Sequence, residues 1–302
     1  MTDLLIVGSV AFDSIQTLSG GVDKALGGSA TYASLSAGYF AAPRVVGIVG
    51  DDFGDEHFER LRARGVDTSG IKKVPGGETF HWKGKYHENM QDRDTLETCL
   101  NVFEGFDPVL SDDFKNSSHL FLGNIDPRLQ SKVLDQIEKP RFVGMDTMNF
   151  WISDALDDLM AVFKRVDALF INDEESFQLS GERLVANAAA RILELGPKFV
   201  IIKRGEYGAY LFGPDDCLFC PAMPLVDVVD PTGAGDSFAG GFMGHIARVN
   251  EINRSSLLDA MRTGTVMASY VCEKFSVDGL EQLDDSKIDE RRRFLERMVS
   301  GS

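Results

Sequence analysis

Short apolar runs of strand-forming residues alternate along the chain with segments of helical composition, and this alternation constrains the fold most strongly. The predicted strands are Leu4–Val7, Val45–Val49, His119–Leu122, Phe142–Met145, Ala168–Ile171, Phe199–Lys203 and Ala209–Phe212. The predicted helices between them are Ser29–Phe40, Glu56–Arg64, Arg128–Glu138, Ala155–Arg165 and Glu182–Leu195. This order favours a mostly parallel sheet with helices on both faces. We therefore predict an α/β fold and a single domain over residues 1–302.

One segment departs from this rhythm. Residues 74–104 contain a Gly-Gly pair and then two stretches of nearly alternating polar and apolar residues, which is typical of a β-hairpin. Residues 14–23 form a second short segment of the same kind. We predict that the two segments form a small β-layer that closes over a site as a lid. Pattern alone equally allows an edge extension of the sheet or the contact surface of a homodimer.

Residues 227–242 carry the strongest chemical signal. A β-branched run ends at Asp230-Pro231, and the small residues Gly233, Ala234 and Gly235 then lead into Asp236 and a helical segment over 237–249. Backbone amides at such a turn and the positive end of a helix form an anion cradle. A carboxylate beside that cradle would repel an anion, so it makes sense as a base that deprotonates a hydroxyl attacking a phosphoryl group.

Composition excludes several classes of partner. The chain has 31 basic and 47 acidic residues, a net charge of −16, which disfavours binding to nucleic acid or to an anionic membrane. The first residues lack the basic and apolar segments of a signal peptide, and no apolar run approaches the length of a membrane span. We expect a cytoplasmic protein that acts on a small molecule.

Polar residues follow several of the predicted strands. Ligands of open parallel sheets bind outside the carboxyl ends of the strands, so these residues are the candidates for a site. They are Asp13, Asn124, Asp146, Asn172 with Glu175, and the segment Lys203-Arg204-Gly205. Taken alone, Asp13 is more simply explained as a loop carboxylate, and Asn172 as a turn residue or a helix cap.

With these residues assembled, the chain resembles the PfkB/ribokinase family of carbohydrate and nucleoside kinases over essentially its whole length. The segments that carry the resemblance are Asp230–Phe242, Gly8–Asp13, the Gly27-Gly28 pair, Asn172–Glu175 and Ile201–Gly208. The resemblance implies a ribokinase-like three-layer sandwich, with a mostly parallel central sheet and a small β-sheet lid. It also implies the cofactors ATP and Mg²⁺, with K⁺ as a further candidate.

The resemblance further implies a role for each matching residue. Asp236 would be the catalytic base, and the amides of Gly233, Ala234 and Gly235 would form the anion hole. The remaining roles are substrate binding by Asp13, Gly27, Gly28, Tyr32 and Asn124; nucleotide binding by Lys203, Gly205, Gly208 and Phe275; water-mediated Mg²⁺ binding by Asn172 and Glu175; and monovalent-cation binding by Asp230 and Thr232.

Two departures from the family pattern bear on the substrate and on the adenine side of the nucleotide. Tyr32 stands where many sugar kinases of the family have asparagine, and Phe275 replaces a glycine near the adenine. Alternation also places Phe80, Trp82 and Tyr86 on one face of the lid and His81 on the other. These rings either stack on a nucleobase or pack against a second lid in a homodimer.

The sequence therefore predicts an ATP-dependent kinase that phosphorylates a hydroxyl of a neutral sugar or nucleoside. The alternative is a small-molecule sensor with the same fold that has lost turnover. A nicotinamide-dependent dehydrogenase is disfavoured, because the first strand is not followed by a Gly-x-Gly-x-x-Gly turn.

Overall fold

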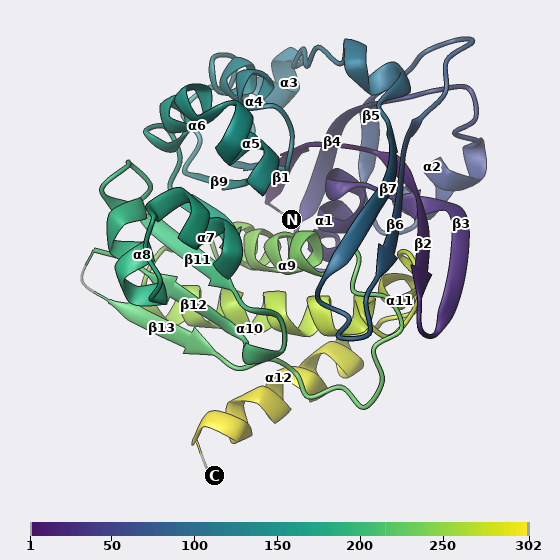
Figure 1. The fold of residues 1–302 in the computed structure, drawn as a ribbon. Helices are drawn as coiled ribbons and strands as arrows, with labels where there is room; N and C mark the ends of the chain where they lie inside the picture. Colours follow the sequence, from purple (N-terminus) through teal and green to yellow (C-terminus); the bar gives the residue numbers. More distant parts are fainter. Residues whose placement is uncertain (1, 215, 301–302) are drawn as a thin grey trace.

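The computed structural model describes residues 2–214 and 216–300. Its larger sheet has nine strands in the order β13-β12-β11-β10-β9-β8-β1-β4-β5 (Figure 1). These strands are β1 (Asp3–Val7), β4 (Ala42–Val49), β5 (Asp67–Lys73), β8 (His119–Leu122), β9 (Phe142–Asp146), β10 (Ala168–Asn172), β11 (Phe199–Lys203), β12 (Ala209–Phe212) and β13 (Cys217–Cys220). All neighbours pair in parallel except β11–β12 and β12–β13. The predicted mostly parallel sheet is confirmed.

Two apolar cores lie on opposite faces of this sheet. In β1, Leu4 and Ile6 belong to one core and Leu5 and Val7 to the other, as expected for a central parallel strand buried on both sides. Helices α1 (Ser29–Ala37), α2 (Asp55–Arg62), α9 (Ala234–Val249), α10 (Arg254–Val271), α11 (Asp278–Glu281) and α12 (Asp285–Ser300) cover the first face. Helices α3 (Asp112–Lys115), α4 (Pro127–Leu134), α5 (Asn149–Asp154), α6 (Leu156–Phe163), α7 (Asp173–Ser180) and α8 (Val185–Leu193) cover the second.

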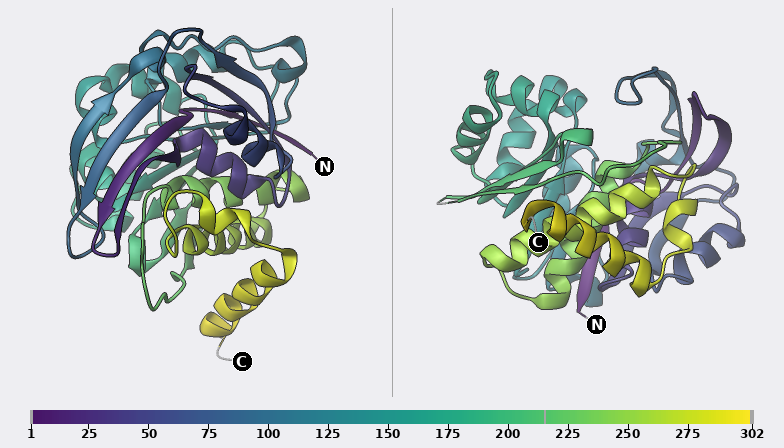
Figure 2. Two further views of the ribbon diagram at one scale, coloured as in Figure 1. Left: turned by 90° about the vertical axis from the view of Figure 1, so that its right-hand side faces the viewer. Right: turned by 90° about the horizontal axis from the view of Figure 1, so that it is seen from below.

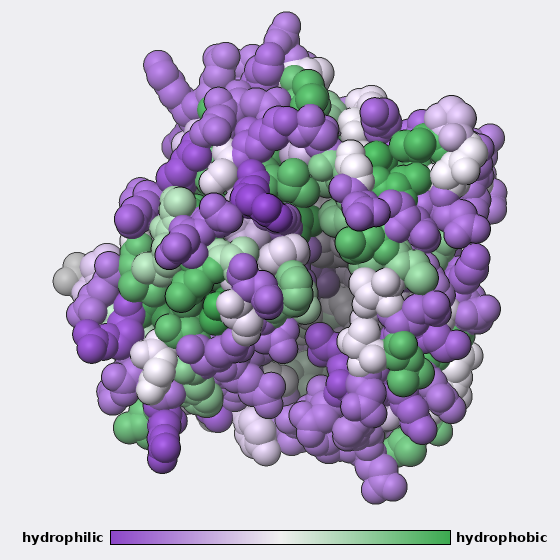
Figure 3. Space-filling model, turned by 45° about the horizontal axis from the view of Figure 1, so that its top comes forward, coloured by the Kyte–Doolittle hydropathy of each residue, from purple (hydrophilic) through white to green (hydrophobic). Residues whose placement is uncertain are grey.

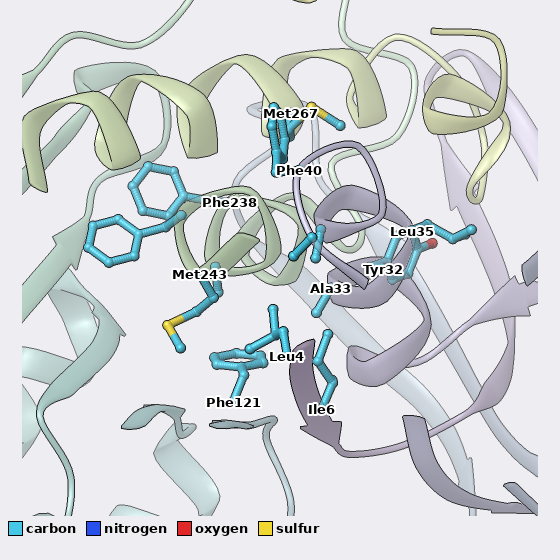
Figure 4. Close-up of a cluster of buried hydrophobic side chains, with 14 of the residues drawn as sticks. Leu4, Ile6, Tyr32, Ala33, Leu35, Phe40, Phe121, Phe238, Met243 and Met267 are labelled. Atoms are coloured by element: carbon cyan, nitrogen blue, oxygen red, sulfur yellow. The ribbon is translucent and has the colours of Figure 1, made fainter. Parts of the chain in front are cut away.

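Helix α9 lies in the middle of the first layer, between α1, α10 and the sheet (Figure 4). Its small residues permit this close packing: a Cβ at Gly240 would lie 2.2 Å from the Ala33 carbonyl oxygen, and one at Gly241 would lie 2.9 Å from Met267. The small-residue content of this segment therefore fixes the position of the helix whose start carries Asp236.

A second sheet of four strands, in the order β3-β2-β6-β7, forms the predicted lid and stands beside the main body (Figure 2). Its strands are β2 (Ala11–Thr17), β3 (Gly20–Gly27), β6 (Phe80–Tyr86) and β7 (Arg93–Cys99). The hairpin predicted within residues 74–104 is confirmed as β6–β7. The first lid segment is longer than the predicted 14–23, because β2 and β3 pair from Ala11 to Gly27. Asp13 consequently lies on a lid strand and not in a loop that follows β1.

Several side-chain hydrogen bonds tie the lid to the body. Thr17 Oγ1 donates to the Val229 carbonyl oxygen at 2.8 Å, and Thr232 Oγ1 donates to the Tyr86 hydroxyl at 3.1 Å. At the tip of the β6–β7 hairpin, Gln91 Nε2 donates to Glu206 Oε1 at 3.1 Å. The lid therefore spans the carboxyl edge of the sheet, and the surface is hollowed into a cleft beside it (Figure 3).

The remaining differences from the predicted elements are local. The helix predicted at 155–165 is α6, the short helix α5 that precedes it was not predicted, and β5 and β13 were not predicted as strands. In the described part of the chain, no helix combines the length and the apolar character that a membrane crossing requires.

Candidate active site

The centre of the site is the turn that begins α9. Gly233 is the N-cap residue and adopts a left-handed conformation with φ 74°, and a Cβ there would lie 2.4 Å from ring atoms of Tyr32. Both observations require glycine at this position. The helix begins at Ala234, three residues earlier than predicted, so Asp236 lies within its first turn.

The turn has the properties of an anion site. No side chain caps this helix end, and the Gly235 amide has no protein acceptor in the described part of the chain. Lys203, at the end of β11, lies beside the turn, because a Cβ at Gly235 would be 3.1 Å from Lys203 Nζ. A free helix N-terminus next to an ammonium group fits the phosphates of a nucleotide.

Lys203 is held by Asp146 at the end of β9. Their side chains form a buried ion pair with a distance of 2.7 Å between Nζ and Oδ2. Burial alone would lower the pKa of Lys203, but the neighbouring carboxylates of Asp146 and Glu175 keep it above its ordinary value. Lys203 therefore carries a positive charge at the edge of the sheet.

Two carboxyl groups near this pair are unusually basic. Burial, together with the charge of Asp146, raises the pKa of Asp236 from 3.8 to about 7, against the opposing effect of Lys203. The same causes raise the pKa of Glu175 from 4.5 to about 7. A carboxylate with a pKa near neutrality is a suitable general base at neutral pH.

Asn172 and Glu175 form a capping box at the start of α7. Asn172 Oδ1 accepts from the Glu175 amide at 2.8 Å, and Glu175 Oε2 accepts from the Asn172 amide at 3.0 Å. These two hydrogen bonds confirm the interpretation of Asn172 as a helix cap. Glu175 still places its charge next to Asp146 and Lys203, where a hydrated cation would be attracted.

Asp13 faces the site from β2. Its carboxylate lies against the end of β3, where a Cβ at Gly27 would lie 2.0 Å from Asp13 Oδ2. Burial raises the pKa of Asp13 to about 7, the charges of Asp230 and Asp236 act in the same direction, and the Gly28 amide partly offsets them. Gly28 has φ 94° and comes so close to Ser9 that a Cβ would lie 2.5 Å from its carbonyl oxygen. The Gly-Gly pair thus joins the lid to α1 beside Asp13.

Tyr32 lies beneath the turn, and its hydroxyl is buried without a hydrogen-bond partner among the described residues. Burial and the nearby charges of Asp13 and Asp230 raise the pKa of Tyr32 well above its ordinary value. Asp230 itself is fully buried and accepts from the amides of Thr232 at 2.9 Å and Ser276 at 3.2 Å. The structure therefore brings Asp13, Tyr32 and Asp230 together below the cleft.

The other predicted residues lie around this centre. Asn124 follows β8, and its Oδ1 accepts from Trp151 Nε1 at 3.0 Å. Gly205 and Gly208, both with positive φ, bound the turn whose Glu206 contacts the β6–β7 hairpin. Phe275 lies near Gly20 at the tip of the β2–β3 hairpin, and its contact with the nucleotide stays a prediction.

The sequence places Asp146 at the end of its strand, but its pairing with Lys203 depends on the order of strands in the sheet. One charged residue of the site, Arg93, was not predicted. Arg93 is the cross-strand partner of Tyr86 on the inner face of the lid, 6.0 Å from the Trp82 ring. Its positive charge lowers the pKa values of Tyr86, Glu175 and Asp236, and it has no acidic partner among the described residues. Only the register of the β6–β7 hairpin places Arg93 opposite Tyr86.

Comparisons with known proteins agree with this geometry. The family described as pfkB family carbohydrate kinase matches residues 1–282. A protein of Thermococcus kodakarensis named cytidine kinase is 29% identical over 283 residues, which cover 91% of this chain and 98% of that protein. Two solved structures confirm the ribokinase-like fold. Arabidopsis thaliana ribokinase with ribose and ATP has a TM-score of 0.79 at 20% identity, covering 97% of this chain and 100% of that one. Aminoimidazole riboside kinase of Salmonella enterica has a TM-score of 0.77 at 17% identity, covering 96% and 100%.

The raised pKa values predict how stability depends on pH. A carboxyl group whose pKa is higher in the folded chain than in the unfolded chain stabilises the fold at low pH. The stabilisation is complete when the pH is below the pKa of the unfolded chain, and it is lost as the pH rises through the pKa of the folded chain. For Asp13, Glu175 and Asp236 the loss falls between about 4 and about 7. Urea unfolding of the ligand-free protein should therefore show stability falling across this range, and Asp236→Asn should reduce the fall. The exposed Asp157→Asn is the charge-matched control, and equal pH dependence in the two variants would contradict the assignment.

Proposed function

The chain belongs to the pfkB family of carbohydrate kinases, and we propose that it is an ATP-dependent kinase that phosphorylates a hydroxyl of a neutral nucleoside or sugar, with a nucleoside as the preferred acceptor. The observation that carries the proposal is the position of Asp236. Its carboxyl group, with a pKa of about 7, stands in the first turn of α9 beside the free Gly235 amide and Lys203. A base and an anion site share one turn.

The donor nucleotide is assigned to the side of the cleft that holds Lys203. The amides of Gly233 and Gly235 and the Lys203 ammonium group are suitable donors for its terminal phosphates, whereas the Ala234 amide already donates to the Pro231 carbonyl oxygen at 3.2 Å. The carboxylates of Glu175 and Asp146 fit a hydrated Mg²⁺, which would neutralise charge between the phosphates when bound. Asp230 and Thr232 stay predicted ligands of a monovalent cation.

The acceptor is assigned to the side that holds Asp13. The Asp13 carboxylate accepts hydrogen bonds from acceptor hydroxyls, and the unpartnered Tyr32 hydroxyl and Asn124 are further candidates for polar contacts. Asp236 then takes the proton of the attacking hydroxyl, while the turn amides stabilise the charge on the transferring phosphoryl group. The charge of Asp236 contributes to the raised pKa of Asp13, which supports placing the donor and acceptor sides next to each other.

Two observations support a nucleoside as acceptor. The similarity to the protein named cytidine kinase spans 91% of this chain. In the lid, Trp82 is only partly buried and lies on the same face as Tyr86 and Arg93, toward the cleft. Its ring is available for stacking on a base, whereas the Tyr86 ring is buried and its hydroxyl is bonded to Thr232. That face is directed toward the body, and a homodimer through the lid stays a prediction.

The acceptor class is tested by ADP formation from ATP and Mg²⁺ with a panel of cytidine, uridine, adenosine, ribose and fructose. We expect acceptor-dependent ADP with nucleosides, at a kcat/KM at least about tenfold above that for ribose, because the base adds stacking energy of about 1–3 kcal/mol.

Preference for the free sugars would contradict the nucleoside assignment but not the kinase. No acceptor-dependent ADP with any member would favour the sensor, which nothing in the comparisons supports.

Arg93 is proposed to stabilise the transferring phosphoryl group from the lid. Its charge reaches Asp236 and Glu175, on the donor side, and it has no ion-pair partner in the described structure. Arg93→Met should lower kcat by about 10²–10³-fold, as for the loss of a donor to a transition-state anion, with little change in acceptor KM. Lys85→Met is the control, because this exposed lysine lies on β6 and pairs across from Asp94. A rise in acceptor KM with normal kcat would place Arg93 on the acceptor instead.

A further inference from the structure

The outer face of the lid carries a group of metal-ligating side chains that the proposed kinase does not use. His81 on β6 pairs across the strands with Cys99 on β7, and Lys83 pairs with Glu97 two residues along. A ring nitrogen of His81, the Cys99 sulfur and a carboxylate oxygen of Glu97 all lie within 4.8 Å of one another. Alternation places these residues on the face opposite Trp82 and Tyr86.

The hydrogen bonds around Ser14 determine which nitrogen of His81 carries the proton. Ser14 Oγ donates its single proton to Asp23 Oδ1 at 2.5 Å and accepts from the Lys24 amide at 3.0 Å. The hydrogen bond from Ser14 stabilises the ionised carboxylate of Asp23 and thereby lowers its pKa. The 2.8 Å contact between Ser14 Oγ and His81 Nε2 must then use a proton on the histidine.

Neutral His81 therefore keeps an unprotonated Nδ1 with a free lone pair. Metal-bound histidines have this arrangement, in which the second ring nitrogen donates to an oxygen that fixes the tautomer and the ring orientation. Ser14 is buried and is itself held by Asp23 and by the backbone. The imidazole is thus oriented as a ligand by its surroundings.

The other two groups complete a ligand set of one nitrogen, one sulfur and one oxygen. Cys99 is a free, partly buried thiol, and burial together with Glu97 raises its pKa. Both groups are close enough to share a cation, and a thiolate with an imidazole and a carboxylate suits Zn²⁺ better than Mg²⁺ or Ca²⁺.

We propose that His81, Glu97 and Cys99 form a Zn²⁺ site on the outer face of the lid, with water in the fourth position. Binding forms a zinc–sulfur bond and releases the Cys99 thiol proton to solvent. The metal would join β6 to β7 at the end of the hairpin remote from its turn. This proposal does not depend on the proposed kinase activity.

The test is a competition between the full-length, tag-free, metal-stripped protein and a chromophoric chelator for Zn²⁺. We expect one zinc per chain, and binding at least about tenfold weaker in Cys99→Ser and in His81→Ala, since even the loss of an outer partner costs that much. Cys217→Ser and His87→Ala are the matched controls, because Cys217 is exposed on β13 and His87 lies on the lid outside the cluster.

Cobalt provides a second readout that does not depend on affinity. The Co²⁺-loaded protein should show a sulfur-to-metal charge-transfer band that disappears in Cys99→Ser and persists in Cys217→Ser. Failure of the unaltered protein to compete with the chelator, or equal zinc affinity in Cys99→Ser, would overturn the proposal. Far-UV circular dichroism of each variant separates loss of a ligand from loss of folding.

Discussion

The contact between Gly233 and the ring of Tyr32 determines the geometry of the whole site. Gly233 has a left-handed backbone conformation and no Cβ, so the chain can turn tightly over the ring and start α9 at Ala234. The close packing of Gly240 against α1 holds the rest of that helix in place. Asp236 is therefore positioned by close packing at the start and in the middle of its helix rather than by a loop.

The charges of the site form a second constraint. Asp13, Asp146, Glu175, Asp230 and Asp236 converge at the carboxyl edge of the sheet in a chain of net charge −16. Lys203 is paired with Asp146, and Arg93, on the lid, has no acidic ion-pair partner among the residues that the structure describes. Burial, together with repulsion from neighbouring carboxylates, raises the pKa values of Asp13, Glu175 and Asp236, and a nucleotide alone would add negative charge to the site. Cations bound with the nucleotide are the natural counter-charge.

Much of this arrangement was predictable from the sequence. The order of strands and helices predicts the sheet, and the Asp230–Asp236 segment predicts the turn, because local residue types determine both. Pairings between distant segments were not predictable. The ion pair of Asp146 with Lys203 depends on both strands ending at one edge, and the inward position of Arg93 depends on hairpin register. The expected role of Phe275 rested on the family resemblance, whereas its position near Gly20 depends on how the lid packs.

The most direct test of the central claim is the turnover of Asp236→Asn measured together with its affinity for ATP. Asparagine keeps the size and the hydrogen-bonding shape of the side chain but cannot accept the acceptor's proton. The account predicts that kcat falls by about 10²–10⁴-fold, the usual contribution of a general base, while the dissociation constant for ATP stays within about threefold. A near-normal kcat in Asp236→Asn would contradict the claim that this turn is the centre of phosphoryl transfer.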